Sequence, residues 1–130
     1  MKKLNNISKI SFHLVNLTLI LLYLYPGSIF GYIVYSDFST HPQITRDFLI
    51  SSNHFYAFIF LSTLGIIAYQ NSYRIGILIK YLFLISIILE LTHIVLPQRG
   101  FELKDLLGNI SGVILVIIIY KLKKKYVQSK

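Results

Sequence analysis

The sequence predicts an all-α membrane protein with four transmembrane helices. Hydrophobic residues make up 55% of its 130 residues and charged residues only 14%, whereas a soluble domain carries about 25% charged residues. A soluble core of this size is too small to bury so many Ile, Leu and Phe side chains. The apolar residues form separate runs, and basic residues gather beside them. Together these features predict a single integral membrane domain over residues 1–130.

The expected helices follow four apolar runs in order. The first run is interrupted by Pro26-Gly27, which predicts one kinked or broken helix, because proline disrupts helical hydrogen bonding. A cleaved signal peptide over residues 1–30 is the alternative, although no Ala-x-Ala-like cleavage site follows. A membrane span needs roughly 20 residues. The third run reaches this length by itself, and the second and fourth runs reach it when their flanking residues are included. The runs are Ile10 to about Tyr35, Asn53–Tyr69, Ile75–Leu96 and Leu106–Tyr120.

The charges in the loops predict that both termini are cytoplasmic. Four crossings place the termini and the turn at residues 71–74 on the same side. This side carries no acidic residue, and its basic residues are Lys2, Lys3, Lys9, Arg74, Lys121, Lys123, Lys124, Lys125 and Lys130. The opposite loops mix both signs, and an excess of Lys and Arg marks the cytoplasmic side. We therefore expect a multi-pass protein of the cytoplasmic (inner) membrane, whose net charge of +8 reflects topology rather than nucleic-acid binding.

Polar residues near the outer end of the third helix are the first candidate functional residues. Glu90 lies six residues before Leu96, and a charged group at mid-membrane costs about 2.5–3.5 kcal/mol. His93 follows one turn later on the same helix face. Pro97 is expected to end the helix, so that Arg99 can fold back toward Glu90.

The fourth and second helices add polar residues at the same depth. Asp105 and Asn109 share one helix face, and the helix dipole favours Asp105 near a helix start. Gly108 and Gly112 form a small-xxx-small pair that lets another helix approach closely. His54 projects from the first turn of the second helix, as an interface anchor or as a proton-transfer group. The residues expected to converge beneath the outer surface are His54, Glu90, Arg99, Asp105 and Asn109.

Several of these residues also have purely structural interpretations. Glu90 and Arg99 can form an ion pair that fixes the outer loop, and His93 can simply hydrogen-bond to Glu90. Asp105 can act as a helix cap, and Asn109 can hydrogen-bond between helices.

No metal or other cofactor is expected. The chain has no cysteine, which excludes a thiolate metal site, a thiol nucleophile and a disulfide scaffold. A metal site formed by His54, Glu90, His93 and Asp105 is conceivable, but the step Glu90-x-x-His93 alone is a weak metal motif. No Gly-rich phosphate loop, nucleophile elbow or zinc-protease helix occurs.

These residues resemble the signature of the VanZ-like family. The segments that carry the resemblance are Glu90-Leu-Thr-His-Ile-Val-Leu-Pro-Gln-Arg99, Asp105-Leu-Leu-Gly-Asn-Ile-Ser-Gly112 and His54-Phe55. They are similar to the family's Glu and Gln in the third helix, its Pro-x-Arg loop and its Asp-x-x-x-Asn-x-x-Gly helix start. The resemblance spans roughly residues 53–119 and implies a small four-helix membrane protein. The family is named for a member linked to resistance to glycopeptide antibiotics.

Two positions depart from the family pattern. His93 stands where the family usually has Gln, which adds a titratable group. The family often has an Asp-Lys pair before its histidine, at the positions that Ile50 and Ser51 occupy here. The charged surroundings of His54 therefore differ from the family's.

The outer polar residues lead to a functional hypothesis: an envelope factor that binds an anionic lipid-linked or phosphate-bearing envelope component, with chemical modification of that component left open. Arg99 would bind phosphate bidentately, and Glu90 would act as general acid or base. The candidate catalytic residues are Glu90, His54 and Asp105, and the candidate substrate-binding residues are Arg99, Asn109 and His93.

Two other classes of function remain open. The chain can be a non-catalytic assembly module that packs through the Gly108/Gly112 face, as a homo- or hetero-oligomer in contact with membrane lipids. A small transporter is the weakest possibility, because the inner halves of the helices offer only scattered Ser, Thr and Asn. The sequence leaves catalysis and binding both open.

Overall fold

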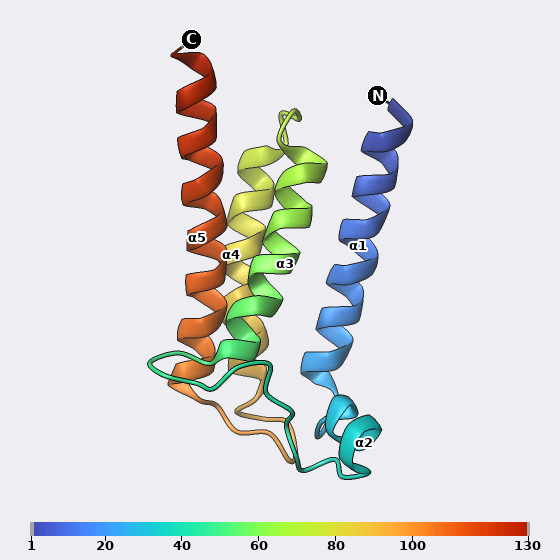
Figure 1. Ribbon diagram of the computed structural model, residues 1–130. Coiled ribbons are helices and arrows are strands. Elements are labelled where there is room, and N and C mark those ends of the chain that lie inside the picture. The colour runs from blue at the N-terminus through green and yellow to red at the C-terminus, as the bar shows by residue number, and fades with distance from the viewer. Residues whose placement is uncertain (1, 130) are drawn as a thin grey trace.

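Five α-helices and no β-strand make up the part of the chain that the computed structural model describes, residues 2–129, with side chains described from residue 6 onward. The helices are α1 (Lys2–Leu24), α2 (Ile29–Tyr35), α3 (Ser52–Tyr69), α4 (Ile75–Thr92) and α5 (Leu103–Gln128). The four long helices lie side by side, and short α2 lies beyond the end of α1 (Figure 1). The predicted all-α class is confirmed.

Three of the helices are long and apolar enough to cross a membrane. They are Asn6–Leu24 of α1, the whole of α4 and the whole of α5. The remaining long helix, α3, has 18 residues and begins with the polar turn Ser52-Asn53-His54. It packs against α1, α4 and α5, and its side chains Phe58 and Leu61 are fully buried.

The first helix breaks where the sequence predicts. α1 ends at Leu24, and Gly27 in the following turn has a φ of 90°, a left-handed conformation that glycine adopts without steric cost. Ser28 caps α2, because its Oγ accepts a 2.9 Å hydrogen bond from the N–H of Gly31. The backbone at Thr40 approaches Gly31 so closely that a Cβ there would overlap the Thr40 carbonyl oxygen. The break thus folds α2 against the loop that follows it.

The end of α4 differs from the prediction. The helix ends at Thr92 rather than at Leu96. The N–H groups of His93 and Ile94 donate to carbonyl oxygens three residues earlier, at 3.1 and 3.2 Å, so the chain tightens into turns before it reaches Pro97. Proline therefore lies beyond the helix and does not itself end it.

α5 is longer than the apolar run that predicted it. It extends from Leu103 to Gln128, whereas the sequence predicted residues 106–120. The additional C-terminal turns are rich in lysine, which is a good helix former and interacts favourably with the dipole at a helix C-terminus. Hydropathy marked only the apolar part of this helix.

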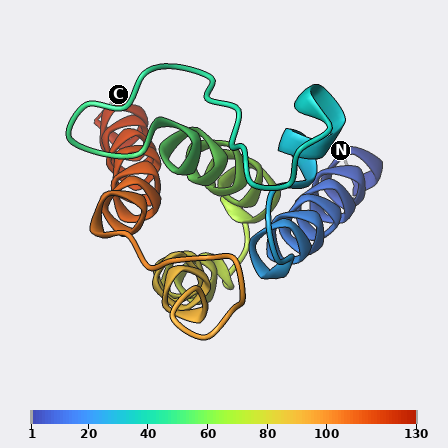
Figure 2. The same cartoon turned by 90° about the horizontal axis from the view of Figure 1, so that it is seen from below.

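Two glycines of α5 allow α3 to pack closely against it. A Cβ at Gly108 would lie 2.7 Å from the carbonyl oxygen of Ser51, and a Cβ at Gly112 would lie 2.6 Å from that of Phe55. Figure 2, seen from below, shows α3 between α5 and α1, with α4 on the other side of the bundle. The predicted small-residue packing face is confirmed, and the helix that occupies it is α3 of the same chain.

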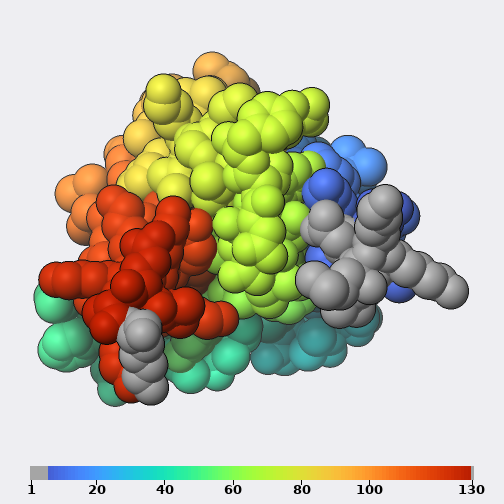
Figure 3. Space-filling model, turned by 90° about the horizontal axis from the view of Figure 1, so that it is seen from above, coloured from blue at the N-terminus to red at the C-terminus, as the bar shows by residue number. Residues whose placement is uncertain are grey.

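The two ends of the bundle carry different residues. The start of α1, the turn between α3 and α4 and the end of α5 lie at one end, which Figure 3 views from above. Exposed basic side chains of this end are Arg74, Lys121, Lys123, Lys124 and Lys125. The opposite end holds α2 and the loops at residues 36–51 and 93–102, together with the candidate functional residues.

Candidate functional site

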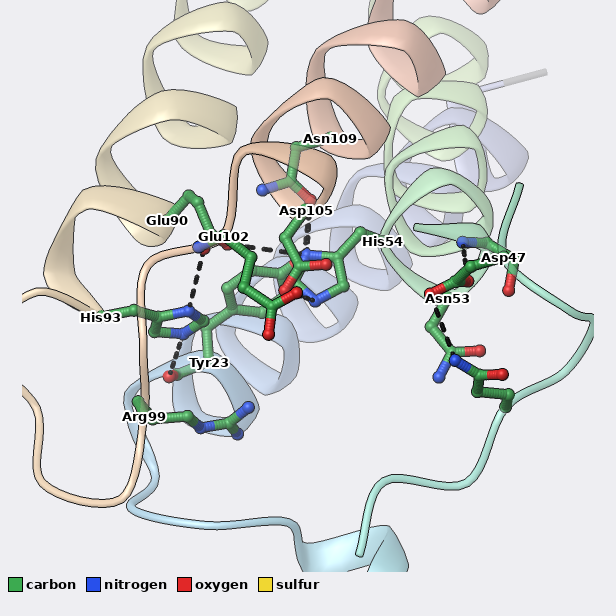
Figure 4. Close-up of polar contacts among 12 residues, drawn as sticks. Tyr23, Asp47, Asn53, His54, Glu90, His93, Arg99, Glu102, Asp105 and Asn109 are labelled. Atoms are coloured by element: carbon green, nitrogen blue, oxygen red, sulfur yellow. Dashed lines mark hydrogen bonds and ion pairs between the residues drawn. The ribbon is translucent and has the colours of Figure 1, made fainter. Parts of the chain in front are cut away.

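Glu90 lies at the centre of the polar cluster and is fully buried in the last turn of α4. Its Oε1 is 3.3 Å from Nδ1 of His93 and accepts a 3.2 Å hydrogen bond from the N–H of Glu102 (Figure 4). Its Oε2 lies 3.7 Å from Nδ1 of His54 and has no hydrogen-bond partner among the described residues. The expected contact between Glu90 and His93 is thus confirmed, and the carboxylate also fixes the loop before α5.

His54 connects Glu90 with the other carboxylate of the cluster. Its Nε2 is 3.3 Å from Oδ2 of Asp105, at the start of α5. Its Nδ1 faces Glu90, the hydroxyl of Tyr23 at 2.9 Å and Oδ1 of Asn109 at 3.1 Å. Both ring nitrogens therefore face oxygen atoms, and the imidazole bridges three other helices from the first turn of α3.

Asn109 holds the helices together beneath His54. Its Nδ2 donates a 3.1 Å hydrogen bond to the carbonyl oxygen of Ser86, and its Oδ1 accepts a 2.7 Å bond from the Tyr23 hydroxyl. Because the amide nitrogen is committed to a carbonyl, the oxygen must face Tyr23 and His54. Asn109 is fully buried, so it acts on the orientation of its neighbours rather than on a ligand in the open.

Tyr23 is a site residue that the sequence did not single out. It lies in the last turns of α1 and is 8% exposed. Its ring stacks on His93, with centroids 5.6 Å apart and an angle of 17°, and meets the ring of His54 edge-on. In the sequence it is one of 10 Tyr, and nothing in the spacing of α1 distinguishes it from an interfacial aromatic residue.

Arg99 does not form the expected ion pair with Glu90. Its Nη2 and Nε donate hydrogen bonds of 3.0 and 3.2 Å to the carbonyl oxygens of Leu22 and Tyr25. These carbonyls lie at the C-terminal end of α1, where helical acceptors have no partner within the helix and the dipole favours a cation. Burial lowers the pKa of Arg99, yet an arginine stays protonated at neutral pH.

Asp105 is not the cap of its helix. Glu102 occupies the N-cap position and makes no side-chain cap hydrogen bond. Asp105 lies in the first turn of α5, as expected near a helix start, but its carboxylate points to His54 instead of to the free backbone N–H groups. The contact across to α3 thus replaces local capping.

An apolar groove lies beside this cluster. It has a volume of about 610 Å³ and runs between the ends of α1 and α3, with α2 and the loop at residues 41–44 as its other walls. Its apolar walls include Leu19, Ile29, Phe30, Val34, Ala57 and Phe60, and its polar lining includes Tyr23, His41, His54, His93 and Arg99. Glu90, Asp105 and Asn109 are not among the lining residues. Only His54, His93 and Arg99 of the predicted site residues therefore meet the groove directly.

The loop wall of the groove is fastened to the start of α3. Asn53 donates to the carbonyl oxygen of Pro42 at 2.6 Å and accepts from the N–H of Ile44 at 2.9 Å. Asp47 accepts a 2.8 Å hydrogen bond from the N–H of Ser52. Asn53 and His41 are further residues with a role at the groove that the sequence did not indicate, because both depend on the path of this loop.

The cluster has two chemical capacities. Its carboxylates and imidazoles lie close enough for proton transfer between them. Single donor atoms of His54, Glu90 and Asp105 also all lie within 4.8 Å of one another, which makes this group a candidate for holding a metal ion. Comparison of the chain with known protein families gives no match, and neither the curated proteins nor the solved structures show significant similarity to it.

Replacing Tyr23 by phenylalanine is expected to destabilise the protein by about 1–2 kcal/mol. The substitution keeps the ring that stacks on His93 but removes the hydroxyl that bonds to Asn109 and His54, and a lost buried hydrogen bond costs about this much. The measurement is the thermal unfolding midpoint in detergent. Tyr32→Phe is the matched control, because Tyr32 is 51% exposed; equal midpoints for both variants would contradict the role of the hydroxyl.

Proposed function

We propose that the chain is a four-span protein of the cytoplasmic membrane, with α3 as the fourth span and both termini in the cytoplasm. The proposal is supported by four long helices lying side by side, three of them with the length and composition of spans. The exposed basic residues of the helix ends, such as Arg74 and Lys121, gather at the end that would face the cytoplasm. The polar cluster and its groove would then open at the outer leaflet.

We propose that the groove binds an anionic, lipid-linked component of the cell envelope. The observation that carries the proposal is that an apolar groove of about 610 Å³ has Arg99 in its lining. The walls suit an acyl or isoprenoid chain, and a guanidinium suits phosphate because it offers several N–H donors in a planar fork. Two of the five donors bind the carbonyl oxygens of Leu22 and Tyr25, which fixes the side chain and leaves the others for a ligand.

His54 is the group best placed to act chemically on such a ligand. It lines the groove, whereas Glu90 behind it is fully buried. A proton exchanged between Glu90 and the ligand would therefore pass through His54 or through His93, which also lines the groove. In this proposal Asp105 and Asn109 orient His54, and Glu90 is the proton reservoir behind it.

The resemblance to the VanZ-like family agrees with this proposal. The residues that carry the resemblance, among them Glu90, Arg99, Asp105 and Asn109, are those that gather around one site. We therefore propose the family's envelope context for this chain. The Gly108/Gly112 face gives little support to an assembly module, because α3 already occupies it.

The proposal predicts a lipid adduct that depends on Arg99. Native mass spectrometry of the full-length protein, purified in detergent with membrane lipids, is expected to show a phosphate-bearing lipid whose occupancy falls at least tenfold in Arg99→Ala. Arg46→Ala is the control, because Arg46 is an exposed arginine in the loop at residues 36–51 at the same end of the bundle. An adduct that survives in Arg99→Ala, or a wild-type protein without any phosphate-bearing adduct, would refute the proposed ligand.

A further inference from the structure

In the part of the chain that the structure describes, neither the buried carboxylate of Glu90 nor the partly buried one of Asp105 forms an ion pair with a lysine or an arginine. Among the described residues, the ion pairs of Glu90 and Asp105 are with His54 and His93 only. Arg99, which lines the groove, hydrogen-bonds to the carbonyl oxygens of Leu22 and Tyr25 instead. Two carboxylates in one partly desolvated site repel each other unless a cation or a proton compensates them.

One oxygen of Glu90 points into this cluster without a hydrogen bond. Oε2 is buried and lies 3.7 Å from Nδ1 of His54, whereas Oε1 is bound by the N–H of Glu102 and by His93. A buried carboxylate oxygen is costly unless it is hydrogen-bonded, paired or bound to a metal. Contacts to Oε1 therefore fix the Glu90 side chain, and Oε2 is left to face the cluster without a hydrogen bond.

We propose that a divalent first-row metal ion, Zn²⁺ or Mn²⁺, binds between a ring nitrogen of His54, a carboxylate oxygen of Glu90 and a carboxylate oxygen of Asp105. Donor atoms of these three residues lie within 4.8 Å of one another. Glu90 faces Nδ1 of His54 and Asp105 faces Nε2, so the side chains have to close around one of these nitrogens to share an ion. The 3.3 Å between Nε2 of His54 and Oδ2 of Asp105 is close to the roughly 3.4 Å that separates two ligands on a tetrahedral ion with bonds of about 2.1 Å. An imidazole with two carboxylates is a donor set that suits either ion.

Neighbouring residues support these ligands. His93 holds Oε1 of Glu90, and Asn109 lies 3.1 Å from Nδ1 of His54. Contacts of this kind fix the orientation of metal ligands and tune their basicity. The sequence led us to expect no metal, although a site formed by His54, Glu90, His93 and Asp105 was conceivable, because the step from Glu90 to His93 is a weak motif. The fold brings His54 from α3 and Asp105 from α5 next to Glu90.

The ion also removes a conflict in the proposed function, on which this step of the inference rests. A phosphate near Arg99 would be repelled by the carboxylates of Glu90 and Asp105 behind the groove. A divalent ion turns the net charge of this group from negative to neutral. With three protein ligands it also keeps an open position for water or a ligand oxygen. The phosphate would then lie between the guanidinium and the metal.

The test is a metal titration of the full-length protein in detergent, without added lipid. The chelator-treated protein is titrated with Zn²⁺ and with Mn²⁺, and bound metal is counted by elemental analysis after desalting. We expect about one ion per chain, and at least tenfold weaker binding in Glu90→Gln, Asp105→Asn and His54→Gln. The controls are His13→Gln, near the other end of α1, and Asp37→Asn, in an exposed loop.

Each outcome decides the inference. Wild-type protein without bound metal, site variants with wild-type affinity, or an equal loss in His13→Gln would overturn it. If Glu90→Gln fails to fold, Asp105→Asn decides, because the Asp105 side chain is 20% exposed. Arg99→Ala separates this proposal from the previous one: it is expected to lose the lipid adduct and keep the metal. A protein that binds lipid but no metal would refute only the metal site.

Discussion

Gly112→Ala is expected to force α5 away from α3 and to lower the stability of the bundle by about 1–3 kcal/mol. The added Cβ would lie 2.6 Å from the carbonyl oxygen of Phe55 and 3.0 Å from Cβ of Phe58. Both atoms belong to the backbone or stand directly on it, so no side-chain rotation relieves the overlap, and overpacking of a tight interface costs this much. Thermal or denaturant unfolding in detergent measures the effect.

Gly76→Ala is the matched control for this substitution. Gly76 lies in α4, and a Cβ there meets no atom within 4 Å. Alanine is favoured over glycine in a helix by about 0.5–1 kcal/mol, so this variant is expected to be as stable as the wild type or slightly more stable. Equal stabilities of the Gly112 and Gly76 variants would show that α3 and α5 are not in close contact.

Glu90→Ala is expected to destabilise the protein by about 2–5 kcal/mol and to loosen the loop at residues 93–102. The substitution leaves a cavity and removes the acceptor of the Glu102 N–H and the partner of His93. Since Arg99 lies in that loop, trypsin is expected to cleave after Arg99 several times faster than in the wild type. Cleavage is followed by mass spectrometry under native conditions.

Glu102→Ala is the control for the loss of a carboxylate in the same region. The Glu102 side chain is exposed, and only its backbone N–H binds Glu90. Its removal is expected to leave both the unfolding midpoint and the cleavage rate near wild type. If Glu90→Ala behaved like this control, Glu90 would not be the centre of the cluster.

The sequence predicted the helices well where apolar runs coincide with them. The second run, residues 53–69, corresponds to α3 within one residue, and Pro26-Gly27 marks the break between α1 and α2. The ends of α4 and α5 were predicted less well. At the end of α4 the backbone tightens through local hydrogen bonds, and at the end of α5 lysines continue a helix that hydropathy does not mark. Hydropathy reports the part of a helix that is apolar, not the part that is helical.

In the site, too, contacts between residues close in the sequence were predicted better than contacts between distant ones. Glu90 and His93 are one helical turn apart, so the sequence predicted their contact correctly. Arg99 was predicted to pair with Glu90 but binds the end of α1, which lies 74 and 77 residues away along the chain. The free carbonyls of a helix end compete for a guanidinium as a carboxylate does, and only the position of α1 decides which acceptor is closer.

The sequence by itself determined the all-helical class, the apolar character of the helices and which residues are costly to bury. Those properties depend on the composition and on the pattern of apolar and polar residues within short segments, so they can be seen without knowing which segments meet in the fold. Only the tertiary structure decided that Tyr23 joins the cluster, that Asp105 faces His54 rather than its own backbone, and that α2 and the loop after it form walls of a groove beside Tyr23 and His54. These contacts join residues that are far apart in the sequence. The glycines of α5 predicted that some helix would approach closely, but only the tertiary structure shows that this helix is α3.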